Sequence, residues 1–415
     1  MNQNMIVNNE TEIQQNREQE EGTMALFTFE DTAGLSARIK VIGVGGGGGN
    51  ALNNMITQKL RGVEFIVANT DAQAIERNHA ETKLQLGADI TRGLGAGANP
   101  GIGRDAAEAE RERIREFMQD TDMVFITAGM GGGTGTGAAP VIAEAAKDMG
   151  VLTVAVVTKP FAFEGKRRMR QAEAGIAELR KFVDTLITIP NQKLIGAVGK
   201  NTSMLEAFRK ADDVLLQAVR GIAELITHTG YMNVDFADVK AVMSETRGVA
   251  MMGSGSASGE SRAIEAAERA ISSPLLEDID IHGAQGILVN VTGNEEMTLA
   301  EYDEAVSIIH NMADEDANII CGMVYDQDAG EEIRVTVVAT GLSGESTLRL
   351  AATAREIEPA KAAARMPNVQ VGTIPLQKTA NQQPPQQHAQ PMPFDQPGFN
   401  DDEFAVPTFL RRQAD

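Results

Sequence analysis

The feature that most constrains this chain is the glycine-rich stretch 129–137, Gly-Met-Gly-Gly-Gly-Thr-Gly-Thr-Gly. It follows the apolar run Met123–Thr127, which predicts a buried strand, and precedes 138–147, which predicts a helix with Pro140 in its first turn. A strand that leads through glycines into a helix N-terminus forms an anion site, because bare backbone N–H groups converge there and the helix dipole favours negative charge. The stretch therefore predicts phosphate binding. It lacks the Gly-Lys-Ser/Thr ending of a P-loop, and with it the lysine that reaches the terminal phosphates.

A second glycine loop lies upstream. Gly45–Asn50 follows the predicted strand Ile39–Val44 and leads into a predicted helix over 51–59. Together with Gly43 the loop matches G-x-G-x-x-G, and Asp71 follows a little over 20 residues later, which taken alone indicates a dinucleotide site of an oxidoreductase. A dinucleotide half-site needs only one such loop. Two loops, each after a strand, favour one polyphosphate held from two sides.

The strand–helix units around these loops predict an α/β fold with a Rossmann-like, mostly parallel sheet that is covered on both faces. A further glycine-rich turn, 93–101, precedes a charged helix predicted over 103–118, and the turn is either a surface loop or a lid over phosphates. The apolar runs 151–157 and 185–189 predict two more strands.

A long apolar stripe at helical spacing over 203–228 predicts a helix roughly 35–40 Å long, enough to cross a domain. Beyond it the pattern changes to helices and strands grouped in a smaller α+β domain. The predicted divisions are a disordered arm 1–36, a nucleotide-binding domain 37–202, the central helix 203–228, a C-terminal domain 229–343, a disordered linker 344–403 and a docking peptide 404–415.

Two pairs of charged residues have both a structural and a functional interpretation. Glu164 and Arg168 are four apart, which favours a helical ion pair, although both can also contact a nucleoside at a strand end. Asp235 and Asp238 open a helix, where one acid caps and the other suits the dipole. The same pair can position a water molecule or a metal, and spacing leaves both interpretations open. Asn191, after the strand that ends in Pro190, is suited to read a purine edge or a ribose.

Composition narrows the partners and the compartment. The net charge of −21 argues against a nucleic-acid partner, since no broad basic footprint can form. The single cysteine cannot make an internal disulfide, which fits a reducing cytoplasm. No apolar stretch approaches the ~18 residues of a membrane span, and the Asn/Gln/Glu-rich start is unlike a signal peptide, so a cytoplasmic protein without membrane insertion is expected.

Four motifs together give a specific resemblance: Ile42–Asn50, Gly131–Gly137, Asn233–Asp238 and the terminal Pro407–Asp415. They resemble the tubulin/FtsZ family of GTPases, with coverage from about 38 to 341 plus the terminal peptide. The arm before residue 37 lies outside the family pattern.

The resemblance implies a role for each matching residue. Phosphates would be held by Gly46, Gly47, Gly48, Gly49, Asn50, Gly133, Thr134 and Gly135; Glu164 and Arg168 would contact the ribose; Asn191 and Asp213 would read the guanine edge beside a stacked Phe208; and Asn233, Asp235 and Asp238 would act on the GTP of the next subunit.

The resemblance further implies a GTPase that makes GDP and phosphate in head-to-tail filaments, the cytokinetic ring at mid-cell in bacterial division, with magnesium held through the GTP phosphates. Residues 404–415 would dock membrane-tethering and regulatory division proteins. The rival is a nucleotide-gated scaffold on the same fold that does not hydrolyse GTP, which spacing alone does not exclude.

Overall fold

A computed structural model describes residues 37–198, 202–227, 234–245, 248–276, 283–327 and 329–342. The predicted arm 1–36, the linker 344–403, the docking peptide 404–415 and Asn233 lie outside these residues. Within the described part, none of the helices combines the length and the apolar character that crossing a bilayer requires.

The described residues contain ten strands, which form one continuous sheet in the order β3-β2-β1-β4-β5-β6-β7-β10-β8-β9. The strands are β1 (Ile39–Val44), β2 (Glu64–Asn69), β3 (Thr82–Gln85), β4 (Met123–Gly129), β5 (Leu152–Lys159), β6 (Thr185–Pro190), β7 (Gly248–Ala257), β8 (Gly286–Gly293), β9 (Asn318–Tyr325) and β10 (Ile333–Leu342). Strands β1 to β6 pair in parallel, whereas β10 pairs antiparallel with both β7 and β8. The predicted α/β class with a mostly parallel sheet is confirmed.

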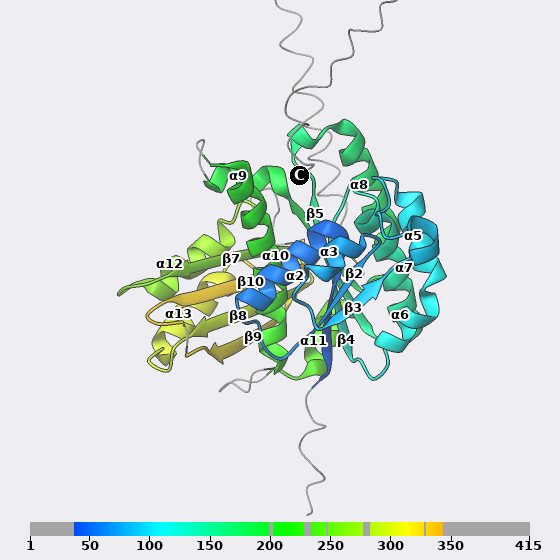
Figure 1. Cartoon of the computed structure of the whole chain (residues 1–415). Coiled ribbons are helices and arrows are strands. Elements are labelled where there is room, and N and C mark those ends of the chain that lie inside the picture. Colours follow the sequence, from blue (N-terminus) through cyan, green and yellow to red (C-terminus); the bar gives the residue numbers. More distant parts are fainter. Residues whose placement is uncertain are drawn as a thin grey trace, which may run out of the picture. The chain divides into compact units, whose positions relative to one another are not determined.

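Helices cover both faces of this sheet (Figure 1). They are α2 (Gly45–Thr57), α3 (Ala72–Glu76), α4 (Ala88–Thr91), α5 (Pro100–Ala109), α6 (Arg111–Phe117), α7 (Thr134–Asp148), the 3-10 turn η2 (Ala162–Glu164), α8 (Lys166–Leu179), α9 (Asn191–Val198), α10 (Met204–Thr227), α11 (Phe236–Glu245), α12 (Arg262–Ile271) and α13 (Leu299–His310).

Strand β4 shows why the parallel part is buried on both sides. Its side chains alternate, so that Phe125 enters the core with α2 and α10, while Val124 and Ile126 enter the core with α5 to α8. All three are fully buried. A strand whose side chains enter a core on each face of the sheet needs apolar residues at every position. The continuous apolar run in the sequence of β4 matches this requirement.

Both glycine loops differ from the prediction because the helices begin inside them. Helix α2 starts at Gly45 rather than 51, and α7 starts at Thr134 rather than 138, so that Pro140 lies in the interior of α7 and not in its first turn. Gly48 explains the early start of α2: a Cβ there would lie 2.3 Å from the carbonyl oxygen of Thr127, so only glycine lets the first turn pack this closely on β4.

The predicted long helix is confirmed as α10, whose 24 residues span roughly 36 Å. Its middle is buried on several sides, including Val219 and Ile222 in the core that also holds α2. At Gly221 a Cβ would lie 2.6 Å from the Thr336 side chain on β10, so this helix packs on the parallel strands and on the C-terminal strands alike.

Strand β7 joins the two parts of the sheet, and the sequence pattern did not predict it. It pairs with β6 over only three residues, from Thr185 and Gly248 to Ile187 and Ala250. Its Gly-Ser-rich sequence reflects close packing, because a Cβ on Gly253 would lie 2.0 Å from a carbonyl oxygen of α12. Strand β7 thus has small residues where most strands have the β-branched residues on which strand prediction relies.

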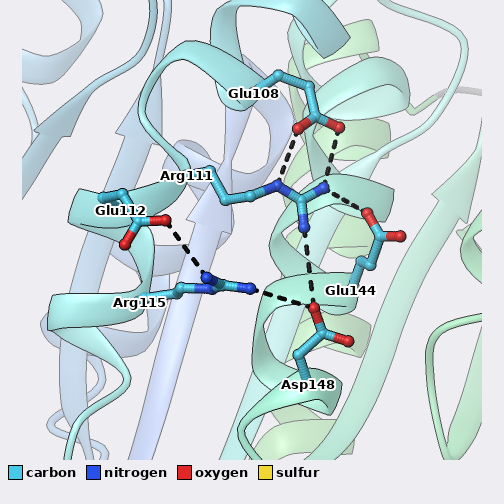
Figure 2. Close-up of polar contacts among 6 residues, drawn as sticks. All are labelled: Glu108, Arg111, Glu112, Arg115, Glu144 and Asp148. Carbon is cyan, nitrogen blue, oxygen red and sulfur yellow. Dashed lines mark hydrogen bonds and ion pairs between the residues drawn. The ribbon is translucent and has the colours of Figure 1, made fainter.

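The helix predicted over 103–118 breaks at Glu110 into α5 and α6, and a cluster of charges ties these helices to α7 (Figure 2). Arg111 donates to Glu108 at 2.9 and 3.0 Å and to Glu144 at 2.5 Å. Arg115 bridges Glu112 at 3.3 Å to Asp148 at 3.4 Å. The hydrogen bonds from Arg111 lower the pKa of the Glu108 carboxyl.

Replacing Arg111 by Gln is expected to lower the free energy of unfolding by about 1–2 kcal/mol, because Glu108 and Glu144 lose a shared bidentate partner. The matched control is Arg113→Gln, which breaks one exposed pair with Glu110 and should change stability by less than about 0.5 kcal/mol. Urea titrations at several pH values measure both. Since Glu108 stabilises the fold only while ionised and its pKa in the folded state is lowered, the loss should shrink as the pH falls below about 4.5. An equal loss in both variants would contradict this assignment.

Candidate functional site

A cavity of about 340 Å³ lies where the parallel strands β4, β5 and β6 end. Ligands of open α/β sheets collect at this edge, where helix N-termini converge. The cavity is lined by Gly46, Gly47, Asn50, Gly129, Met130, Gly132, Gly133, Thr134, Gly135, Thr158, Pro160, Glu164, Arg168, Asn191, Phe208, Ala211, Asp212 and Leu215.

The two glycine loops form one side of this cavity together. Gly45 has φ +71°, and a Cβ there would lie 2.8 Å from the backbone nitrogen of Gly135. A Cβ on Gly47 would likewise lie 3.1 Å from the backbone nitrogen and Cα of Gly129. The first turns of α2 and α7 therefore present their free N–H groups to a single space, which suits the successive phosphates of one ligand.

Hydrogen bonds fix the second loop in place. The hydroxyls of Thr134 and Thr70 lie 2.6 Å apart, and the N–H of Gly131 donates to Thr136 Oγ1 at 2.8 Å. Gly48 and Gly49 do not line the cavity. They lie behind its wall, where the Gly49 carbonyl accepts a hydrogen bond from Asn78 Nδ2 at 2.8 Å.

Opposite the loops, Asn191 and Phe208 form a wall suited to a base. Asn191 opens α9 and is 4% exposed, yet its Oδ1 is buried without a hydrogen-bond partner within the described structure. Buried acceptors are rarely left unpaired, so this atom fits a ligand that brings an N–H donor. Phe208 is held edge-on by Phe161, with ring centroids 5.3 Å apart, and its ring is partly exposed for stacking.

The predicted role of Asp213 needs a correction, since Asp212 is the acid on the cavity wall. The carboxylate of Asp213 instead accepts a hydrogen bond from Asn54 Nδ2 on α2 at 3.0 Å. Helical geometry gives the reason: relative to Phe208, Asp212 is rotated by only about 40° around α10, whereas Asp213 is rotated by about 140°. Burial, with a smaller contribution from Asp213, raises the pKa of Asp212 to about 7.

Glu164 and Arg168 form the predicted ion pair, and both also line the cavity, where their contact with a nucleoside stays a prediction. Arg168 Nη1 donates to Glu164 Oε2 at 2.5 Å, and both side chains line the cavity. Glu164 Oε1 also accepts from the Phe161 N–H at 2.9 Å, which fixes the carboxylate beside the β5 end.

Two other predicted features do not line the cavity. Asp71 caps α3, where its carboxylate accepts hydrogen bonds from the N–H groups of Gln73 at 2.9 Å and Ala74 at 3.2 Å. The contact with a ribose that a dinucleotide site of an oxidoreductase would require of Asp71 is therefore not supported. The turn 93–101 packs behind the second loop, because a Cβ on Gly133 would lie 2.8 Å from Ala96.

Asp235 and Asp238 lie towards the end of the sheet where the parallel strands begin, whereas the cavity lies where these strands end. They open α11, whose Met243 carbonyl accepts from Thr185 Oγ1, at the first residue of β6, whereas the cavity lies at the strand's last residues. The Asp235 carbonyl accepts from the N–H of Asp238 at 3.0 Å, and both side chains are exposed. Within the described residues neither carboxylate makes a hydrogen bond or an ion pair.

Comparisons with known proteins agree with this geometry. A family model described as "Tubulin/FtsZ family, GTPase domain" matches residues 38–199, and one described as "FtsZ family, C-terminal domain" matches 248–343. The chain is 54% identical to a cell division protein FtsZ of Azotobacter vinelandii over 395 residues, covering 94% of this chain and 100% of that protein. It is 59% identical to a cell division protein FtsZ of Pseudomonas aeruginosa over 317 residues, covering 76% and 80%.

Among solved structures, one described as "FtsZ dimer, empty (M. jannaschii)" matches with a TM-score of 0.71 and 48% identity, over 74% of this chain and 89% of that chain. The residues that the GTPase-domain model matches include both glycine loops. The chain therefore belongs to the tubulin/FtsZ family and carries the GTPase domain of that family.

Proposed function

We propose that the chain binds GTP in the strand-end cavity, hydrolyses it to GDP and phosphate, and assembles head to tail into filaments in bacterial cell division. The N–H groups of the two helix starts, at Gly46, Gly47 and Asn50 and at Gly133 to Gly135, hold the phosphates. Glu164 and Arg168 contact the ribose. Asn191 Oδ1 and the Asp212 carboxylate accept hydrogen bonds from the guanine edge, while Phe208 stacks on the ring. The unpaired, buried Asn191 Oδ1 is the observation that carries this assignment.

Hydrolysis takes place between subunits. The phosphate loops supply positioning but no carboxylate, and the acids that line the cavity are Glu164, which is paired with Arg168, and Asp212 at the base end. Asp235 and Asp238 lie free at the opposite edge of the sheet, so stacking one subunit on another brings them to the neighbour's phosphates. There they orient the attacking water in line with the bond that breaks. The predicted Asn233 lies outside the described residues and is proposed to assist them.

Magnesium would enter with the nucleotide. Within the described ranges no group of three His, Cys, Asp or Glu side chains is placed to hold an ion. An ion bound through phosphate oxygens needs no such protein cage, and when bound it would neutralise charge on the phosphates.

The head-to-tail contact does not close on itself, so assembly gives an open filament. We further propose that residues 404–415 dock membrane-tethering and regulatory division proteins, and that the filament acts in the cytoplasm at mid-cell. The similar M. jannaschii structure described as a dimer supports self-association.

Binding of GDP should weaken as the pH falls from 8 to 6. The pKa of Asp212 in the unliganded protein is about 7, and only the carboxylate accepts from guanine, so affinity should drop roughly tenfold across this range. The same raised pKa makes the unliganded fold less stable as the pH rises from about 4 to about 7, because the folded state then holds more protons than the unfolded chain.

Displacement of a fluorescent GDP at pH 6, 7 and 8 measures this dependence. Asp212→Asn should bind more weakly and with a flat profile. The comparison variant Asp213→Asn should still lose affinity as the pH falls, but over a somewhat lower pH range, because the charge of Asp213 contributes to the raised pKa of Asp212. An unchanged slope in Asp212→Asn would assign the titration to another group.

The experiment that tests the proposed function is the GTPase rate against protein concentration, with light scattering on the same samples. A shared site predicts a rate per molecule that rises above a threshold together with the scattering. A rate per molecule that stays flat while filaments form would mean that each chain carries a complete site, and Asp235 and Asp238 would then be helix-capping acids only.

A further inference from the structure

A second cavity of about 280 Å³ lies where the two parts of the sheet separate. The pairing of β6 with β7 ends at Ile187 and Ala250, and beyond it β7 pairs, among the described strands, with β10 alone. The cavity follows this free part of β7, from which Ser254 and Ser256 line it, and it is closed on the other side by α9 and α10. The GTPase part and the C-terminal part therefore both contribute to its walls.

The charged residues that line this cavity are all cations, namely Lys210, Arg269 and Arg334. The sign of this local charge is opposite to that of the whole chain, whose net charge is −21. Arg269 donates to the Ser256 carbonyl at 2.5 Å and to the exposed Glu265 at 2.9 Å, an acid that does not line the cavity. Such a space concentrates small anions.

Arg334 gives an independent indication of a missing ligand. Its Nη1 is buried without a hydrogen-bond partner in the described part of the chain. The guanidinium also borders the space beyond α10, where its charge acts on Glu224. Buried nitrogens of charged groups are costly when unpaired, so an acceptor beside Nη1 is expected.

The remaining wall is apolar, with Leu194, Val214 and Leu275 among its residues. Small-molecule sites commonly combine such a wall with a few convergent polar groups. We propose that this cavity binds a small organic anion, a phosphate or carboxylate with an apolar body, through Lys210, Arg269 and Arg334.

Such a ligand would affect the nucleotide site, because the two cavities share one wall. On α10, Phe208 and Asp212 face the nucleotide cavity, whereas Lys210 and Val214 line the second. Each pair is four residues apart and thus lies on one face, and the two faces are opposite. The anion therefore holds the helix that carries the base wall. This coupling, unlike the anion site itself, rests on the proposed GTP pocket.

Phenyl phosphate and benzoate, titrated into the full chain saturated with GDP, test the site, because GDP keeps both probes out of the nucleotide cavity. Calorimetry should detect one site per chain. Tighter binding of phenyl phosphate would show that the site prefers a phosphate, and tighter binding of benzoate would show that it prefers a carboxylate. Phenol, which has the same ring without the charge, should not bind. Bound probe should also change the rate of GDP release at least twofold.

The double variant Lys210→Gln/Arg269→Gln should lose at least roughly tenfold in probe affinity, since two charge-assisted contacts are removed. The matched control Arg113→Gln/Lys181→Gln removes two surface cations elsewhere and should bind as the wild type does. If the double variant does not fold, Lys210→Gln alone still tests the site, because Lys210 makes no ion pair within the described residues. Absence of binding to the wild type, or equal binding by Lys210→Gln and the wild type, would overturn the proposal.

Discussion

Replacing Asp238 by asparagine is expected to lower GTP turnover at least a hundredfold while leaving GTP affinity and the fold unchanged. The residue is exposed in the first turn of α11, where asparagine fits equally well, so the substitution removes a charge and little else. A group that positions or activates water contributes about a hundredfold or more to a rate. Steady-state phosphate release, with sedimentation to confirm that filaments still form, measures the effect.

Two further substitutions separate catalysis from helix capping. Asp235→Asn keeps an equally good N-cap residue, so any fall in its turnover reports on the carboxylate and not on the helix. Asp303→Asn removes an exposed acid from α13 and should turn over GTP at the wild-type rate. If Asp238→Asn hydrolysed GTP normally, the interface mechanism would be wrong even though the nucleotide assignment could stand.

Replacing Gly137 by alanine is expected to destabilise the fold by about 3 kcal/mol or more, a fall of roughly 10 °C in the thermal midpoint. A Cβ at this position would lie 2.0 Å from the Pro100 carbonyl oxygen and 2.7 Å from the Arg104 nitrogen, both backbone atoms of α5. Neither can move without separating α5 from α7. Calorimetry on the nucleotide-free protein measures the change.

The contrasting substitution is Gly46→Ala. A Cβ on Gly46 meets nothing within 4 Å, and the residue lies in the first turn of α2, so the fold should keep its stability. Because Gly46 lines the cavity, its new methyl group should instead weaken GTP binding by about tenfold or more. Equal stability in the two variants would show that the α5–α7 contact is softer than its distances indicate.

This contrast marks what the sequence can and cannot predict. That the two glycine loops meet at one cavity could be predicted, because strand, glycines and helix follow one another along the chain at both. Which glycines line the cavity and which allow close packing depends on neighbours far away in sequence, as for Gly48 against Thr127. No local pattern contains that information.

The prediction of the cavity-lining acid was wrong by one residue for a related reason. Asp212 and Asp213 are chemically identical, and only the rotation of α10 relative to Phe208 distinguishes them. Counting from Phe208 by helical turns would have selected Asp212, since the cavity-lining Ala211 and Leu215 follow the same spacing. The strand β7 had no such signal, because its glycines and serines match the surface of α12 rather than any strand propensity.

On the proposed mechanism, in which the acids of one subunit act in the cavity of the next, the number of working sites depends on filament length. A filament of n subunits has n − 1 contacts between subunits. A dimer would therefore have one complete site for two bound nucleotides, and about half the maximal rate per chain. One terminal subunit always keeps an intact GTP with no neighbour to hydrolyse it, while the other terminal subunit displays carboxylates with nothing to act on. The two tips of every filament therefore differ in chemistry, and short filaments lose their GTP more slowly than long ones.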